Sequence, residues 1–177
     1  APDRRSLKEP YDPARPVARS TLDTVLAAAA RTRTAGDVSA KSIAELRALT
    51  HEALLIEIET PRTYRVSVDL FRVGAAAVDA TPDGIDFTGP LFELPGGAGM
   101  MVRSALRDPA SSAYAEGLAA VYANTDTAMG HLWTVTPGNT RTDQIAAGRD
   151  WLQLNLAATA QGLGMQPLSQ ALQEYPE

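Results

Sequence analysis

A long segment near the end of the sequence, Thr142–Gln161, constrains the fold more than any other feature. Asp143 stands at its start, where the positive end of a helix dipole favours a carboxylate. Apolar or small side chains lie on almost every face of this predicted helix. A helix that is apolar all round is normally buried on all sides. A chain of 177 residues has little material with which to surround it, so we expect a second copy or a second domain to supply part of its cover.

The glycine-containing segment that follows, Gly162-Leu163-Gly164, is a candidate binding loop. Gly162 stands where a left-handed residue usually ends a helix. Glycine also lets backbone N–H groups approach a flat ligand, because no side chain stands in the way. On spacing alone, a helix C-cap is the simpler interpretation of these glycines.

The rest of the chain alternates helical patterns with strand and turn signals. Ser42, with Glu45 three residues later, is typical of a capping box at a helix start. No internal repeat is visible, and the length favours one domain over residues 1–177. The first predicted elements are an extended arm over residues 1–20, a helix capped by Ser20 or Thr21 and broken at Gly36-Asp37, and a helix over Ser42–Glu57 ended by Thr60-Pro61-Arg62. Next come an ambiguous helix or strand over Tyr64–Val73, a turn at Pro82-Asp83-Gly84 and a flexible loop over Leu94–Met101. A helix over Ser111–Asn124 and a central strand over Ala128–Thr136 follow.

Charge and composition exclude several classes of protein. The net charge of −5 argues against a general nucleic-acid surface, which needs a basic patch. The absence of cysteine excludes disulfides, thiolate metal sites and a cysteine nucleophile. No apolar run reaches the roughly 18–20 residues that cross a membrane. We therefore expect neither nucleic acid nor a membrane as a partner.

Side chains that could carry catalysis or hold a metal give no convincing cluster. His51 and His131 have no paired ligand at helical spacing, and we interpret both as surface or core histidines. The run Gly96-Gly97-Ala98-Gly99 lacks the lysine of a phosphate-binding loop. Glu52, Glu57 and Glu59 are typical of a solvated helix face, or of an ion-paired corner with Arg62. We predict no catalytic side chain and no metal site.

The arm opens with Arg4, Arg5 and Ser6, which are suited to a phosphate group. Two guanidinium forks and a hydroxyl on an extended segment can donate several hydrogen bonds to phosphate oxygens. An arginine pair near a chain end is more often merely solvated. No hydrophobic stretch follows this pair, so the segment as it stands is not a signal peptide.

Taken in order, these segments resemble FMN-dependent nitroreductases. "DRRSLKEPYDPARPV" is similar to the family's N-terminal arm, and "DQIAAGRDWLQLNLAATAQGLGMQPLSQALQEYPE" to its central helix and following loop. "EALLIEIETPRTYRVSVDLFRVG", "PDGIDFTGPLFE" and "TAMGHLWTVTPGNTRTDQIAAGR" are closer to the Acg-like branch. Chains of that branch are often assigned a twin-arginine signal and fuse two nitroreductase-type halves. The resemblance covers nearly the whole chain.

The resemblance implies an α+β fold with a central, mainly antiparallel sheet wrapped by helices and a long buried interface helix. FMN would lie at that interface, against a second nitroreductase-type half or a homodimer partner. The implied reaction passes a hydride from NAD(P)H through FMN to a nitro compound or quinone, without a side-chain acid or base. The implied FMN-binding residues are Arg4, Arg5, Ser6, Gly162, Leu163, Gly164, Pro167, Leu168 and Ser169.

The sequence departs from that branch at both ends. A preceding half with an Asn-Thr-Gln-Pro-Trp-type segment and a following arginine-containing motif for the FMN phosphate are not present. We therefore expect an incomplete second half. Flavin storage, or a structural half-domain without turnover, is the alternative function, and a ligand-free interaction domain is a third. We expect a cytoplasmic location, or export by the twin-arginine route if a signal precedes Ala1.

Overall fold

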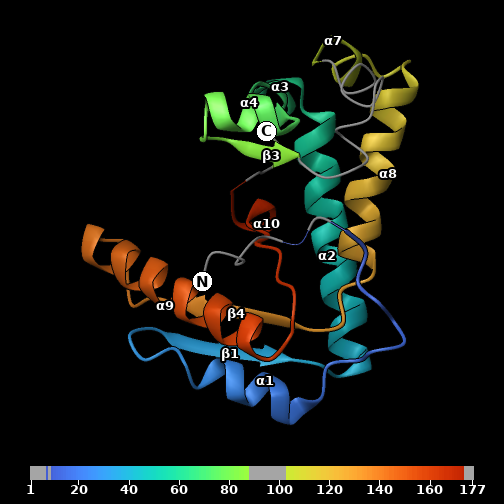
Figure 1. Ribbon diagram of the computed structural model, residues 1–177. Coiled ribbons are helices and arrows are strands. Elements are labelled where there is room, and N and C mark those ends of the chain that lie inside the picture. Colours follow the sequence, from blue (N-terminus) through green and yellow to red (C-terminus); the bar gives the residue numbers. More distant parts are fainter. Residues whose placement is uncertain (1–6, 8, 88–102, 174–177) are drawn as a thin grey trace. The chain divides into compact units, whose positions relative to one another are not determined.

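The computed structural model describes residues 7, 9–87 and 103–173 of an α+β protein in which helices dominate (Figure 1). The chain divides into two compact units. The first unit is Ala1–His51 with Ala123–Ser169, and the second is Glu52–Tyr122 with Gln170–Glu177. The helices are α1 (Arg19–Leu26), α2 (Ala40–Glu59), α3 (Pro61–Asp69), α4 (Ala75–Ala80), α7 (Arg103–Leu106), α8 (Ser112–Asp126), α9 (Arg141–Ala160) and α10 (Gln170–Gln173), and the strands are β1 (Arg33–Asp37), β2 (Phe71–Val73), β3 (Ile85–Phe87) and β4 (His131–Val135).

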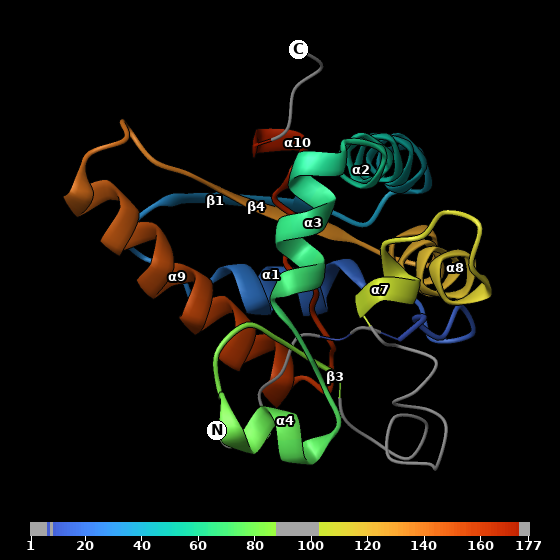
Figure 2. The same ribbon diagram turned by 90° about the horizontal axis from the view of Figure 1, so that it is seen from above.

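In the first unit, β1 and β4 form an antiparallel pair in the register Arg33↔Val135 to Asp37↔His131. The helices α1 and α9 pack on one face of this pair, as Figures 1 and 2 show. Buried Val25, Leu154 and Ala158 form the core, and Leu132 packs against them from the sheet. The predicted strand over Ala128–Thr136 is therefore β4, which pairs with β1 alone among the described residues.

Gly36 lies inside β1 and does not end the preceding helix, so that prediction is wrong. The helix α1 already ends at Leu26. A Cβ at Gly36 would stand 2.8 Å from the carbonyl oxygen of His131 and 3.2 Å from Cδ1 of Leu22. Glycine is therefore needed where β1 passes closely between β4 and α1.

The start of α2 also differs from the prediction. Ser42 lies inside the helix, and its N–H donates to Oγ of Ser39 over 3.4 Å. Ser39 has the capping role because its hydroxyl and carbonyl oxygens face the first turn, and its carbonyl accepts from the N–H of Ile43. The predicted end is confirmed, since α2 stops at Glu59 and Pro61 begins α3.

The second unit has a small core of Val68, Leu106 and Ala113. The ambiguous segment resolves into the helix α3 followed by the strand β2, which pairs in parallel with β3. The predicted turn before β3 is present, with Gly84 at φ +83°. Glu57 accepts a 2.7 Å hydrogen bond from Ser67, so it does not belong to a purely solvated face. The Leu94–Met101 loop and the Gly96–Gly99 run lie outside the described residues.

The helix α9 fulfils the prediction for Thr142–Gln161 to within one residue at each end. Thr140 and Asp143 form a capping box at its start. Among the described residues of this helix, those that are buried are Asp150, Leu154, Asn155 and Ala158. Ile145 and Leu152 on α9 remain 47% and 43% exposed. The second copy or domain that would cover them stays a prediction.

In the described part of the chain, no helix is long and apolar enough to span a bilayer.

A buried carboxylate, Asp150, ties α9 to the segment between α1 and β1. Its Oδ2 accepts from the N–H of Arg31 over 2.8 Å, from the N–H of Thr32 over 2.6 Å and from the hydroxyl of Thr32 over 2.8 Å. Its Oδ1 accepts from the Arg31 guanidinium over 3.3 Å. Burial alone would raise the pKa of Asp150, but these hydrogen bonds outweigh it and lower the pKa from 3.8 to about 2.

We expect Asp150→Asn to lower the free energy of unfolding by at least about 2 kcal/mol, because an amide cannot accept from all these donors. Asp23→Asn is the control: its exposed ion pair with Arg19 predicts a loss below about 0.5 kcal/mol. The stabilisation by Asp150 is complete above pH 3.8 and should fade as the pH drops towards 2, since the folded state holds the lower pKa. Urea unfolding of both variants between pH 7 and 2 measures this, and equal losses in the two variants would contradict it.

Candidate functional site

The start of the described arm lies directly against the candidate loop. The N–H of Leu7 donates to the carbonyl oxygen of Met165 over 2.8 Å. A Cβ at Gly164 would stand 2.8 Å from Cδ2 of Leu7, so the Leu7 side chain packs closely against Gly164 because this residue has no side chain. Residues from opposite ends of the sequence thus meet in the first unit. We call Leu7, Glu9, Tyr11 and Gly164-Met165-Gln166 the arm–loop junction.

The predicted loop residues divide into two groups. Gly162, at φ +71°, donates its N–H to the carbonyl of Thr159, and Leu163 donates its N–H to the carbonyl of Ala158. This pair of bonds is a Schellman motif, so the helix C-cap interpretation is confirmed for Gly162 and Leu163. The Leu163 side chain packs against the core of the first unit. Neither N–H is therefore available to a ligand.

The other predicted loop residues continue past the cap. Gly164 faces Leu7, Pro167 is exposed, and Leu168 and Ser169 are half-buried. The predicted phosphate-binding residues Arg4, Arg5 and Ser6 lie outside the described residues. They precede Leu7 directly in the sequence. The structure therefore brings the segment that follows them to the loop.

The last turn of α8 holds the arm from the other side. Asn124 is 5% exposed, and its amide group donates to the carbonyl oxygens of Leu7 over 3.1 Å and Glu9 over 2.7 Å. The hydroxyl of Thr127 accepts from the N–H of Tyr11 over 2.8 Å. The described part of the arm is thus held by hydrogen bonds at Leu7, Glu9 and Tyr11.

Two polar side chains at the junction lie in a desolvated environment. Burial raises the pKa of the Tyr11 hydroxyl, although hydrogen bonding with the Asn124 side chain and the Gln166 backbone opposes the rise. The side-chain oxygen of Gln166 is buried and has no hydrogen-bond partner among the described residues. A buried acceptor without a partner is costly, so this oxygen is a candidate contact for an N–H or O–H group of a ligand.

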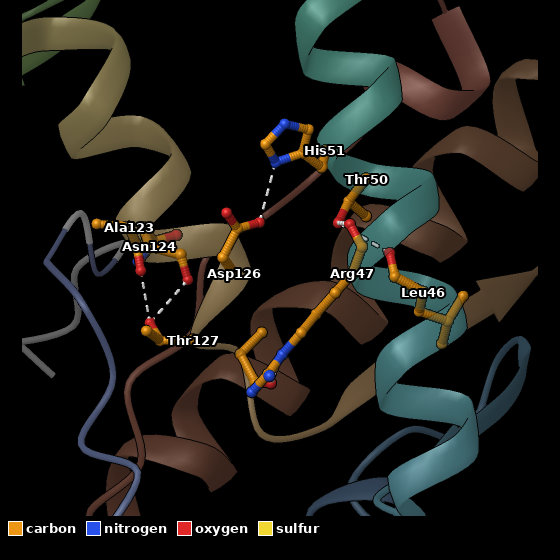
Figure 3. A network of polar contacts seen from close by, with 9 residues as sticks. Leu46, Arg47, Thr50, His51, Ala123, Asn124, Asp126 and Thr127 are labelled. Carbon is orange, nitrogen blue, oxygen red and sulfur yellow. Dashed lines mark hydrogen bonds and ion pairs between the residues drawn. The ribbon is translucent and has the colours of Figure 1, made fainter.

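The same turn of α8 also bonds to α2, as Figure 3 shows. The Nδ1 of His51 lies 3.1 Å from Oδ1 of Asp126, and the Nε of Arg47 donates to the carbonyl of Ala128 over 2.7 Å. His51 is therefore an exposed partner of a carboxylate, in line with a surface histidine.

The described residues contain no group of three or more histidines and carboxylates that could hold a metal ion.

His131 is the second histidine, and its ring nitrogens are buried without hydrogen-bond partners in the described part of the chain. Burial lowers its pKa, and the nearby Arg47 charge lowers it further. The ring is therefore mostly neutral at pH 7. His131 is half-buried, in line with its interpretation as a surface or core histidine.

Asn124, Tyr11 and Gln166 did not stand out in the sequence. An asparagine near the end of an alanine-rich helix is ordinary, and only its long-range partners distinguish it. Tyr11 had a weak signal, since an aromatic residue in a proline-rich arm favours an arm that packs against the protein.

No protein-family model, curated protein or solved structure matches this chain.

We expect Gly164→Ala to displace Leu7 and to weaken its hydrogen bond to Met165. The amide hydrogen of Leu7 should then exchange about five-fold faster, the change expected for a loss near 1 kcal/mol. Gly148→Ala is the matched control, because a Cβ there meets no atom within 4 Å. Hydrogen exchange followed by NMR measures both. Unchanged exchange at Leu7 in Gly164→Ala would show that the close approach does not hold the arm.

Proposed function

We propose that this protein binds FMN at the arm–loop junction and is an oxidoreductase of the nitroreductase type. The reaction would transfer a hydride from NAD(P)H through FMN to a nitro compound or quinone. The observation that carries this proposal is the hydrogen bond between Leu7 and Met165. This bond joins the residue that follows Arg4-Arg5-Ser6 to the glycine loop. The resemblance assigns both Arg4-Arg5-Ser6 and this loop to FMN binding.

The junction and the residues that precede it in the sequence suit the two chemically different parts of FMN. The phosphate needs several positive or hydrogen-bonding donors, and Arg4, Arg5 and Ser6 supply two guanidinium groups and a hydroxyl. The flat ring system carries N–H groups as well as carbonyls, and the buried oxygen of Gln166 is an acceptor without a partner among the described residues. Gly164 lets the arm approach the loop because it adds no side chain where Leu7 lies.

The chain's own contribution to the reaction would be binding, orientation and electrostatics. FMN, when bound, supplies the hydride chemistry. Loop N–H groups beyond Leu163 would stabilise negative charge near the ring, since those of Gly162 and Leu163 are taken by the helix cap. The half-buried Leu168 would help to exclude water. No side-chain acid or base is assigned.

The exposed apolar surface of the first unit favours a companion. Trp133 and Val135 on β4 point away from the core residue Leu132 and are 42% and 43% exposed. Ile145 and Leu152 of α9 are a second exposed apolar pair, and either pair suits a second nitroreductase-type half or a homodimer partner. We propose that the predicted nitroreductase-like arrangement, with a larger sheet and α9 at an interface, is completed by that companion. Flavin storage without turnover remains the second candidate, because such an assembly can hold flavin without reducing it.

We expect the full chain to bind FMN, and Arg4→Ala combined with Arg5→Ala to raise its dissociation constant roughly tenfold or more, because charge-assisted bonds to the phosphate are lost. Arg15→Ala, an exposed arginine farther along the arm, is the matched control and should leave binding unchanged. Quenching of flavin fluorescence measures the constants.

Turnover separates the two candidate functions. Oxidation of NADH or NADPH by the FMN-loaded protein, with a nitroaromatic or quinone acceptor, would support the reductase. Bound FMN that neither nicotinamide reduces would support storage. A protein that takes up no FMN would contradict both.

A further inference from the structure

His131, the first residue of β4, has ring nitrogens that are inaccessible to solvent. Neither nitrogen has a hydrogen-bond partner among the described residues. The next residue, Leu132, packs against the core formed by α1 and α9, so the alternation of a strand places His131 on the opposite face of the β1–β4 pair. There the ring lies close enough to Arg47 of α2 to feel its positive charge. The first unit thus holds a buried titratable group beside a permanent cation.

Arg47 is held near this ring by a bond to the segment before β4. Its Nε donates to the carbonyl oxygen of Ala128 over 2.7 Å, and Ala128 is only 7% exposed. Figure 3 shows Arg47 extending from α2 towards the segment that follows α8. A guanidinium stays charged throughout the range in which histidine titrates. A protonated His131 would therefore meet a like charge that is fixed in place.

The backbone around His131 is closely packed. A Cβ at Gly36 of β1 would stand 2.8 Å from the carbonyl oxygen of His131. A Cβ at Gly130 would stand 2.9 Å from Cγ1 of Val38, in the turn that leads into α2. A charged imidazole needs water or an acceptor at its N–H groups. Since the packing leaves little room for water, the start of β4 and the first turns of α2 must separate before a protonated ring can be solvated.

The other charged groups on the surrounding elements have partners of their own. Asp37, opposite His131 in the β1–β4 register, accepts from the N–H of Ser39 over 2.8 Å. The other pairs on these elements are Arg19–Asp23 on α1, Lys41–Glu45 on α2, His51–Asp126 between α2 and α8, and Arg31–Asp150 on the face that α9 covers. In the described part of the chain, no carboxylate bonds to either ring nitrogen. Protonation of His131 therefore adds a positive charge that no bonded partner compensates.

We propose that His131 is an acid-sensitive device that holds the start of β4 to the first turns of α2. The uncharged ring packs beside Arg47 at neutral pH. When the ring takes up a proton, repulsion and the need for solvation break the bond between Arg47 and Ala128 and release residues 40–47 from β4. This inference is independent of flavin binding.

The direction of the response follows from the environment of the ring. Burial and Arg47 lower the pKa of His131 in the folded protein below its ordinary value of 6.5. The contribution of the neutral ring to stability is therefore complete above about pH 6.5 and is lost as the pH falls through the lower folded value. One proton taken up on opening can change the opening equilibrium by up to about tenfold per pH unit.

Amide hydrogen exchange of the full chain between pH 7 and 5, corrected for the intrinsic rates, measures this opening. We expect protection of residues 40–47 and of β4 to fall about tenfold over this range. His131→Phe keeps a ring and removes two nitrogens that have no bond to lose, so its protection should not depend on pH. His51→Phe makes the same change at the other histidine of the sequence, which is 40% exposed, and should keep the wild-type response.

Arg47→Met gives an independent readout, because methionine keeps an unbranched apolar side chain and removes the charge. The ring titration of His131, followed by NMR, should move to higher pH in this variant than in the wild type.

Three results would overturn the inference. A wild-type His131 ring that titrates at or above the ordinary position of histidine would show that the fold does not oppose its protonation, whether or not His131→Phe folds. Equal acid loss of protection in the wild type and His131→Phe would assign the response to another group. Constant protection of the wild type from pH 7 to 5 would show that protonation does not release α2.

Discussion

The buried carboxylate of Asp150 is the interaction on which the first unit depends. It lies on α9 and accepts hydrogen bonds from consecutive residues, Arg31 and Thr32, at the point where the chain enters β1. A carboxylate without these donors would be an uncompensated buried charge, which proteins tolerate badly. The direction of β1, and through it the pairing with β4, is therefore set by one side chain distant in sequence.

The position of the arm–loop junction depends on the sheet and the core of the first unit. The register of the sheet fixes Leu132 against the core, and the core fixes the end of α9 through Ala158 and Leu163. The Schellman motif at Gly162 then sends the chain towards Met165, which meets Leu7. The candidate site thus depends on interactions that contribute no ligand contact of their own. Substitutions in the core should alter it through the position of the loop.

The sequence predicted the elements that local chemistry determines. The helix α2 ends just before Pro61, and Gly162 ends α9 in the left-handed conformation. The pairing of β1 could not be predicted, because Arg33–Asp37 is polar and has no alternating apolar pattern. Asp150 was missed for a related reason: its partners lie in another part of the sequence, and only the tertiary structure distinguishes it from a solvated charge. The same holds for Asn124.

The bond between Leu7 and Met165 has a consequence for how the protein is made. The arm leaves the ribosome long before Met165 does, so it waits without this partner while everything between the two is synthesised. Because Leu7 and Met165 are so far apart in the sequence, this contact belongs late in folding. A small molecule that bound both the arm and the loop would slow the separation of these two segments. The rate of proteolysis would then measure how much of the protein has the ligand bound.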